Sequence, residues 1–381
     1  MKKTMIPAVM GVLLAWSALV PCASGSNIPS GPAETAPLPG EGAAVPRDMP
    51  PYNDVALPPA VALCGEPLPL DERQVWERLD REFTIAVWNR AQVFLWLKRA
   101  GRYFPYIEAE LAAAGMPDDL KYLAVAESDL QSHVRSPAGA MGTWQFMDRT
   151  AQRHGLEKNQ QLDERRDFER STAAALSYLQ TLRRQFGSWT LAMAAYNCGE
   201  NRVAREISEQ RVSDYYRLDL PLETERYIFR IAAIKVIMEN PEHYGYRIDP
   251  THVYAPRAVD TVNVSLPHPV HIADLAQALG TDFKVIKELN GHIRGHQLPA
   301  GRYTLNLPAG NGDGIASLLR DLARSEVKPK TGTSTRHHVV RAGETLSHIS
   351  QITGVSLAQL RQLNGIDGGL IRTGQKILIT P

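Results

Sequence analysis

One acidic residue, Glu127, interrupts the apolar face of a predicted helix. Glu127 follows Leu120 by seven residues and Leu123 by four, so the three side chains share one helical face. Burial beside apolar neighbours disfavours a charged carboxylate and raises its pKa. A carboxylic acid that is still protonated near neutral pH is what a general acid in glycoside cleavage requires. The position of Glu127 therefore predicts an acid–base catalyst.

A structural role for Glu127 explains the same pattern. A buried glutamate can pair with an arginine such as Arg149 or Arg153, and structural ion pairs also perturb pKa values. Asp129 lies two residues further on and points to another side of the helix, so it is no natural partner. The residue pattern by itself leaves the catalytic and the structural interpretation open.

Three motifs follow in order along the chain. The first joins Glu127 and Ser128 to SPAGA at residues 136–140 and GTWQFM at residues 142–147. The second is AAYNCG at residues 194–199, and the third is LPLETERY at residues 220–227. In sequence and spacing these motifs resemble the soluble lytic transglycosylase family. The resemblance implies a helical, goose-type-lysozyme-like fold and cleavage of the MurNAc–GlcNAc bond of bacterial peptidoglycan.

The implied reaction needs only one carboxylate, whereas an ordinary glycosidase uses two. The resemblance implies that the C6 hydroxyl of MurNAc is the nucleophile. Glu127 would first protonate the departing glycosidic oxygen. As a carboxylate it would then take the proton of the C6 hydroxyl, and a 1,6-anhydro ring would close. The attack gains from proximity, because the nucleophile is tethered to the reacting sugar.

The resemblance also implies roles for residues around Glu127. Ser136 would hydrogen-bond the carboxyl group or the MurNAc side, although a serine before proline also forms ordinary turns. Gln145 and Met147 would line the substrate cleft, and a position in the core is the alternative for Met147. Tyr196 would place its hydroxyl near Glu127, or else it would bury its ring and point outward.

The remaining motif residues receive weaker assignments. Asn197 is interpreted as partly substrate-binding and partly structural. Gly139 and Gly142 would let the backbone approach the sugar, or they would only shape a loop. Glu223 and Tyr227 are interpreted as framework or rim residues.

The C-terminal part contains an internal repeat. Leu-Asn-Gly at residues 289–291 recurs at residues 363–365, and a short alternating strand follows each copy. In the second copy GETL at residues 343–346 opens a helix, and Ser356 with Gln359 predicts a capping box for another. This β-α-α-β unit at residues 337–380 resembles LysM, a module that binds glycans containing N-acetylglucosamine. The first copy, at about residues 260–308, lacks GETL and is a degenerate LysM-like module or a structural spacer.

The N-terminus predicts export. Lys2 and Lys3 precede an apolar run at residues 5–20 and then small residues, which is the order of a secretory signal. Residues 19–22, LVPC, resemble a lipoprotein box, so Cys22 is a candidate for lipidation and membrane anchoring. Simple cleavage near residues 23–25 is the alternative. The periplasm or cell envelope is the expected location.

Composition excludes some classes of function. The 381 residues are 44% hydrophobic and 22% charged, as in globular proteins. A formal net charge of +1 gives no bulk electrostatic reason to expect nucleic-acid binding. No Cys/His spacing suggests a metal site, and no cofactor is implied.

The expected architecture is an all-α goose-lysozyme-like catalytic domain followed by small α+β modules of β-α-α-β order. We expect a signal peptide at residues 1–25, a proline-rich disordered linker at 26–68, the catalytic domain at 69–246, the degenerate LysM-like module at 260–308, a linker at 309–336 and the LysM domain at 337–381. Within the catalytic domain the apolar periodicity predicts helices at residues 71–100, 105–114, 143–154, 168–186, 190–197 and 224–240, with Gly101 ending the first.

The expected function is a lytic transglycosylase that acts as a monomer on peptidoglycan glycan strands and is targeted to the wall by LysM. A hydrolytic muramidase on the same fold is one alternative. A non-catalytic peptidoglycan-binding protein is another, but Glu127 together with Ser136, Gln145 and Tyr196 argues against it.

Overall fold

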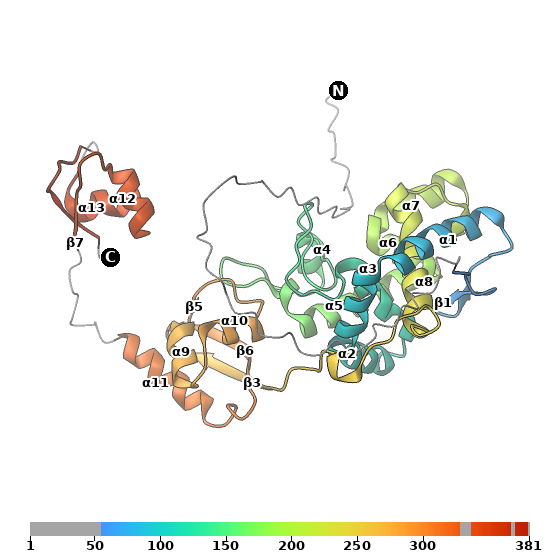
Figure 1. The fold of residues 1–381 in the computed structure, drawn as a ribbon, viewed down its shortest axis with the longest axis horizontal. Helices are drawn as coiled ribbons and strands as arrows, with labels where there is room; N and C mark the ends of the chain where they lie inside the picture. Colours follow the sequence, from blue (N-terminus) through green and yellow to red (C-terminus); the bar gives the residue numbers. More distant parts are fainter. Residues whose placement is uncertain (1–54, 328–336, 367–369, 380–381) are drawn as a thin grey trace, which may run out of the picture.

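A computed structural model describes residues 55–327, 337–366 and 370–379 of the chain (Figure 1). The predicted signal peptide and Cys22 fall outside the described residues. The structure contains a helical domain, a middle module and a C-terminal module, and each has its own hydrophobic core. Among the described residues no helix is both long and apolar enough to cross a membrane.

The helical domain packs around one central helix, α8 (Leu222–Glu239), which is apolar on nearly every side. Helices α1 (Arg73–Trp88), α3 (Lys121–Ser128) and α6 (Trp189–Cys198) pack directly against α8. The outer elements are α2 (Arg90–Ala113), α4 (Asp148–Arg153), α5 (Phe168–Phe186) and α7 (Glu200–Gln210). Four short 3-10 turns complete the domain: Asp118–Leu120, Glu164–Arg166, Tyr215–Arg217 and Pro250–His252.

The predicted helix end at Gly101 is wrong, because α2 continues through this glycine and through Pro105. A Cβ atom at position 101 would lie only 2.2 Å from Cγ1 of Val253. Gly101 therefore lets the chain after α8 lie against α2, and the helix stops only before Gly115, whose φ is +63°. The break expected at Gly101 is found instead at Asn89, between α1 and α2.

The predicted helix at residues 143–154 is also mostly wrong. Only Asp148–Arg153 is helical, and residues 142–145 form a turn between Met141 and Phe146, which pair with each other. Gln145 has a φ of +46°, which an α-helix does not allow. Helix α7 was not predicted.

The last part of the linker expected at residues 26–68 is ordered. Strands β1 (Ala62–Leu63) and β2 (Glu66–Pro67) form a hairpin on the helical domain. The Glu66 carboxylate accepts the backbone N–H of Trp189 at 2.6 Å and that of Thr190 at 3.0 Å. This contact satisfies free amides at the start of α6 and fixes the hairpin.

The middle module has the order β-α-α-β. Strands β3 (Val259–Leu266) and β6 (Gly301–Pro308) are antiparallel, with Leu266 opposite Gly301. Between these strands in the chain come helices α9 (Ile272–Ala278) and α10 (Phe283–Leu289). The same stretch contains two short antiparallel strands, β4 (Val270–His271) and β5 (Gln297–Leu298), which pair with each other. Helix α11 (Ile315–Val327) buries Ile315 and Leu319 in the same core, so this part of the expected linker at 309–336 belongs to the module.

The C-terminal module repeats this order with β7 (His337–Val339), α12 (Leu346–Thr353), α13 (Leu357–Asn364) and β8 (Lys376–Leu378). The predicted capping box of Ser356 and Gln359 is present. Asn364 donates to the carbonyl of Leu378 and accepts its N–H. Asn290 makes the same two bonds with Asn306 in the middle module. The repeated asparagine thus joins the second helix to the last strand in both modules.

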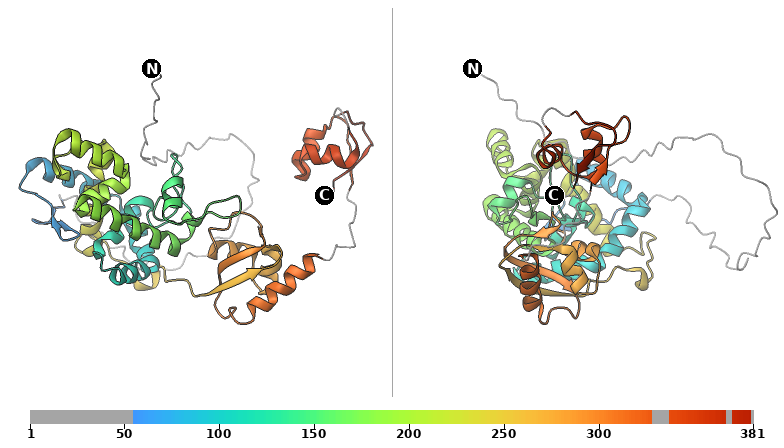
Figure 2. Two further views of the ribbon diagram at one scale, coloured as in Figure 1. Left: turned by 180° about the vertical axis from the view of Figure 1, so that it is seen from behind. Right: turned by 90° about the vertical axis from the view of Figure 1, so that its left-hand side faces the viewer.

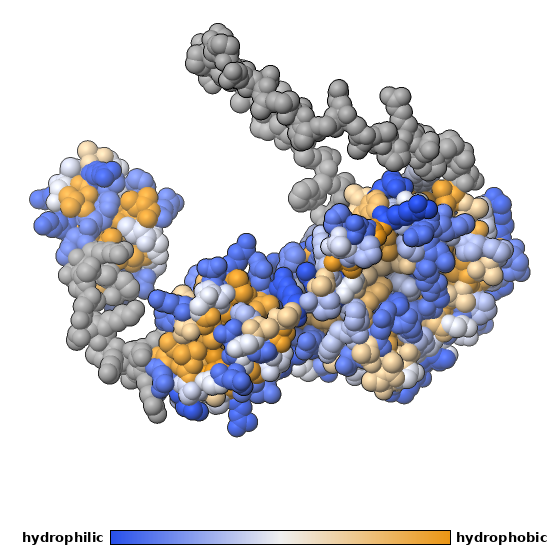
Figure 3. All heavy atoms as spheres, turned by 60° about the horizontal axis from the view of Figure 1, so that its bottom comes forward, coloured by the Kyte–Doolittle hydropathy of each residue, from blue (hydrophilic) through white to orange (hydrophobic). Residues whose placement is uncertain are grey.

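The middle module lies against the helical domain, which Figure 2 shows from two further sides. Backbone bonds join them, from Asp163 N–H to the His292 carbonyl at 2.8 Å and from Arg294 N–H to the Gln161 carbonyl at 2.6 Å. In Figure 3 the two units meet without a gap, and apolar residues gather in patches on the middle module among polar ones. Two surface recesses flank this junction, of about 390 and 520 Å³, and Glu127 lines neither.

Candidate active site

Glu127 lies in the last turn of α3, where the helix meets α8. Its neighbours on α3, including Leu123 and Ala124, are fully buried, while Glu127 itself is half-buried. Asp129 ends the helix in the left-handed conformation with a φ of +55°. The Asp129 carboxylate accepts the indole N–H of Trp96 at 2.7 Å, so it is held away from the site as predicted.

Tyr227 on α8 donates its hydroxyl to Oε1 of Glu127. The tyrosine is buried, and a buried hydroxyl needs a partner of this kind. Of the two roles predicted for Tyr227, the rim position is wrong because the ring is buried, whereas its bond to the Glu127 carboxyl group fits a framework role. The sequence signal that pointed to Tyr227 was its place in the third motif, and no local pattern indicates its partner.

The pKa of Glu127 is raised to about 7. Burial is the main cause. The Tyr227 hydrogen bond and the positive charge of Arg230 lower this pKa, and the negative charge of Glu223 raises it slightly. Arg230 is itself bound to Glu223 at 2.9 Å, and the Glu223 charge offsets part of the effect of Arg230 on the Glu127 pKa.

The ion-pair interpretation of Glu127 is wrong. Arg153 binds Glu200 at 2.7 Å, and Glu200 also accepts the Tyr178 hydroxyl at 2.7 Å. Within the described part of the chain, Glu127 has no cationic nitrogen within 4.0 Å and Arg149 forms no salt bridge. Glu127 is thus a protonatable carboxyl group held by a neutral hydrogen bond.

The loop at residues 134–147, here called the signature loop, carries three of the predicted site residues. Ser136 accepts the Ala140 N–H at 3.0 Å, which is the turn chemistry considered as its alternative role. Gln145 donates its amide N–H groups to the carbonyls of Val134 at 3.1 Å and Gly142 at 2.8 Å. Both side chains shape the loop. Met147 is 40% exposed, so the alternative of a core position is wrong.

The two predicted residues on α6 hold the site from the other side. Tyr196 donates its hydroxyl to the Trp144 carbonyl at 2.7 Å, so it binds the signature loop. Burial raises the pKa of Tyr196, and the Glu127 charge adds to the shift, which indicates that the two groups are neighbours. Asn197 accepts the Thr224 hydroxyl at 2.7 Å and joins the end of α6 to the start of α8.

Comparison with known families identifies two domains. Residues 104–218 match the model of the transglycosylase SLT domain, and residues 338–380 match that of the LysM domain. The chain therefore carries a helical SLT domain and a small LysM domain with strands and helices, and the predicted fold class is confirmed.

Among individual proteins, the chain is similar to membrane-bound lytic murein transglycosylase D of Escherichia coli (strain K12), with 34% identity over 295 residues. The match covers 74% of this chain and 64% of that protein, so the chain spans slightly less than two thirds of the relative's length. It also shares 46% identity over 50 residues with an autolysin of Enterococcus faecalis, covering 13% of this chain and 7% of that protein. The predicted resemblance is confirmed.

A solved structure, that of the 70 kDa soluble lytic transglycosylase of Escherichia coli, has a TM-score of 0.29 and 19% identity to this protein. That match covers 46% of this chain and 32% of the solved one.

Proposed function

We propose that this protein is a lytic transglycosylase that cleaves the MurNAc–GlcNAc β-1,4 bond of peptidoglycan without water. The observation that supports it best is Glu127, a half-buried carboxyl group with a pKa of about 7 that forms no salt bridge with any residue in the described part of the chain. Such a group holds a proton near neutral pH and can release it to a departing glycosidic oxygen. The SLT domain match and the similarity to a murein transglycosylase support the same substrate.

The hydrogen bond to Tyr227 suits both steps of the proposed reaction. Tyr227 occupies Oε1 of Glu127, so the acidic proton is directed to Oε2. In the first step this proton passes to the glycosidic oxygen while the C1–O4 bond breaks. In the second step the carboxylate takes the proton of the MurNAc C6 hydroxyl, and the new C1–O6 bond closes the 1,6-anhydro ring. Glu127 ends protonated, so no atom or electron is left over.

The other predicted site residues stay proposed substrate contacts: Ser136, Gln145, Met147, Tyr196 and Asn197. Met147 offers the largest free apolar surface among them, and an apolar surface can pack against a sugar ring. Glu223 is the other carboxylate whose charge acts on Glu127, but Arg230 binds it at 2.9 Å. A two-carboxylate mechanism would need such a group to be free.

The LysM domain is proposed to hold the enzyme on peptidoglycan glycan strands. We propose export to the cell envelope through the N-terminal signal, with Cys22 as the candidate lipid anchor, and action as a monomer.

The test is mass spectrometry of soluble products from purified peptidoglycan. The wild type is compared with Glu127→Gln, which keeps the size of the side chain and removes the acid. Glu77→Gln is the matched control, because Glu77 is exposed and pairs with Arg73 far along the chain from the site motifs. Products ending in 1,6-anhydroMurNAc, made by the wild type and the control only, are expected. Products one water heavier would identify a muramidase, and no release by any protein would leave a wall-binding protein.

A further inference from the structure

Arg165 lies beneath the signature loop and is only 3% exposed. Its guanidinium group donates from Nε and Nη2 to the two carboxylate oxygens of Asp163, at 2.8 and 2.7 Å. The third nitrogen, Nη1, donates to the carbonyls of Gly139 at 3.1 Å and Phe146 at 3.2 Å. One planar side chain thus ties together two points of the loop that are seven residues apart, which the fork geometry of arginine permits.

The backbone of Arg165 contacts the same loop between those two points. A Cβ atom at Gly142 would lie 1.8 Å from the Arg165 carbonyl oxygen. Position 142 must therefore be glycine for the loop to reach Arg165, whatever the role of Gly142 toward a sugar. Across the loop, Gln145 and Tyr196 form the hydrogen bonds described above. The shape of the signature loop therefore depends on a residue outside all three motifs.

The segment that carries Arg165 is also where the middle module docks. Asp163, the partner of Arg165, donates its N–H to the carbonyl of His292. Leu162 packs against the apolar core of the middle module and forms a bridge with Ile293. On the same module, buried His292 lies 3.3 Å from the carboxylate of Asp167.

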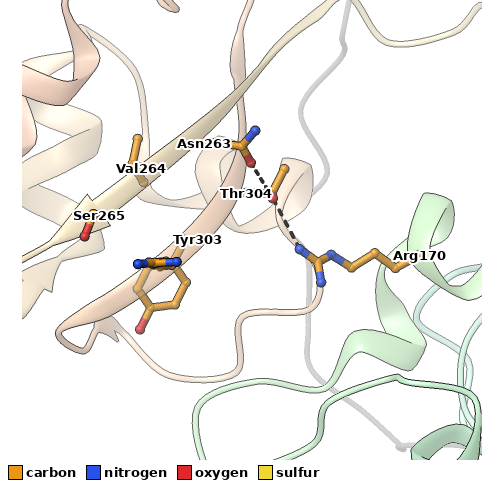
Figure 4. Close-up of a pocket in the computed structure, with 7 residues that line it drawn as sticks. Arg170, Asn263, Val264, Ser265, Tyr303 and Thr304 are labelled. Atoms are coloured by element: carbon orange, nitrogen blue, oxygen red, sulfur yellow. Dashed lines mark hydrogen bonds between the residues drawn. The ribbon is translucent and has the colours of Figure 1, made fainter.

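A second row of contacts fixes the junction further along α5. Arg170 donates to the Thr304 hydroxyl at 3.2 Å, and Thr304 donates to Asn263 at 2.8 Å (Figure 4). Arg170 also binds Glu164 at 2.8 Å, so the turn that contains Arg165 is held from both sides. The middle module therefore contacts the residues before and after Arg165.

We propose that Arg165 is a positioning residue for the signature loop and that the middle module braces the segment that holds it. The docked module restrains residues 159–170, this restraint fixes Arg165, and Arg165 fixes residues 139–146. The expected effect on kcat rests on the proposed function, whereas the restraint of the loop does not. The middle module is then part of the catalytic unit.

The test compares full-length variants. Arg165→Lys keeps a positive charge beside buried Asp163 but cannot bind the carboxylate and both loop carbonyls at once. Leu162→Ser weakens the docking of the module without replacing any residue of the signature loop. Matched controls are Arg73→Lys, which alters an exposed pair with Glu77, and Leu370→Ser, which alters a 92% exposed leucine.

Two kinds of measurement are made: amide hydrogen exchange, and steady-state kinetics on peptidoglycan that give kcat and KM. Arg165→Lys is expected to speed exchange at residues 139–146, to leave α8 protected, and to lower kcat by about 10- to 100-fold with little change in KM, because misplacing a site by 1 Å has costs of that size. Leu162→Ser is expected to speed exchange in the same loop by a smaller factor.

Wild-type exchange in the loop of Arg165→Lys would overturn the positioning role. So would faster exchange that extends to α8, because it would mean a general loss of stability. Wild-type loop exchange in Leu162→Ser would overturn the brace. If the wild type itself releases nothing from peptidoglycan, the proposed function fails while hydrogen exchange still decides the positioning role.

Discussion

The Tyr227 hydroxyl donates to the Glu127 carboxyl group and joins α8 to α3 at the candidate active site. The two residues are 100 positions apart in the chain. The bond has two consequences for chemistry. It lowers the pKa that burial would otherwise raise further, and it occupies Oε1, so that in the proposed reaction Oε2 would carry the acidic proton. Removing the hydroxyl should therefore change both the pH dependence and the rate.

Tyr227→Phe is expected to lower kcat by about 10- to 150-fold, since a hydrogen bond to a charged group contributes about 1.5–3 kcal/mol. A general acid must be protonated, so wild-type activity should fall as the pH rises through about 7, the pKa of Glu127. The variant lacks a contact that lowers this pKa, so its activity should fall at higher pH. The measurement is kcat against pH. Tyr254→Phe, at an exposed tyrosine, is the control. If kcat of Tyr227→Phe fell at the same pH as kcat of the wild type, the assignment of Glu127 as the general acid held by Tyr227 would be contradicted.

Glu127→Gln is expected to change stability in a way that depends on pH. The folded protein holds the Glu127 proton up to about pH 7, whereas a free glutamate holds it only up to about pH 4.5. Between these values the unfolded chain binds fewer protons than the folded one, so the free energy of unfolding falls as the pH rises. Glutamine does not titrate, so its contribution to the free energy of unfolding does not change with pH.

Relative to the wild type, Glu127→Gln should therefore gain about 2 kcal/mol of stability between pH 4 and pH 8, because one pKa unit corresponds to 1.36 kcal/mol and Glu127 is only half-buried. Urea unfolding at the two pH values measures the difference. A stability difference between the two proteins that is the same at both pH values would show that Glu127 is not buried as described.

The elements that were predicted well from sequence carry their signals locally. Helix α5 spans Phe168–Phe186 as expected, because Asp167 caps its first turn and Gly187 ends it with a φ of +76°. Helix α6 similarly begins after the cap of Ser188. The errors have distant causes. Gly101 was mistaken for a helix end because the residue that packs on it, Val253, lies more than 150 positions away.

The candidate site likewise combines features with local sequence signals and contacts between residues that are distant in the chain. The position of Glu127 on an apolar face is a local pattern, and the motifs indicated the loop around Ser136 and Gln145. The bond between Tyr227 and Glu127 could not be predicted, because the two residues lie on different helices. Arg165 was missed altogether, since its bonds to Gly139 and Phe146 depend on how two loops fold together.

Gly142→Ala is expected to be far more destabilising than Gly155→Ala. Both glycines have left-handed backbones, with φ of +85° and +80°, so each alanine is strained by about 1–2 kcal/mol. Only Gly142 also meets the Arg165 carbonyl oxygen at 1.8 Å, while Gly155 has no neighbour within 4 Å. We expect a total cost of about 4 kcal/mol at position 142. Equal midpoints of the two variants in urea would contradict the close contact with Arg165.

Asn364→Ala is expected to abolish wall binding without affecting turnover of soluble glycan. The side chain of Asn364 donates to the carbonyls of Leu360 and Leu378 and accepts the Leu378 N–H at 2.7 Å. Its loss leaves strand β8 without these partners, at a cost of about 2–3 kcal/mol. A module with so small a core has little stability to spare, so it should unfold.

Pelleting with insoluble peptidoglycan measures the wall binding of Asn364→Ala, and Asn201→Ala, at an exposed asparagine of α7, is the control. Loss of pelleting only in Asn364→Ala, with both variants cleaving soluble strands at the wild-type rate, would separate wall binding from catalysis. The SLT domain and middle module share a direct interface, whereas Asn364 contributes only to the core of the C-terminal module. Reduced cleavage of soluble strands by Asn364→Ala would mean that the C-terminal module also supports the active site.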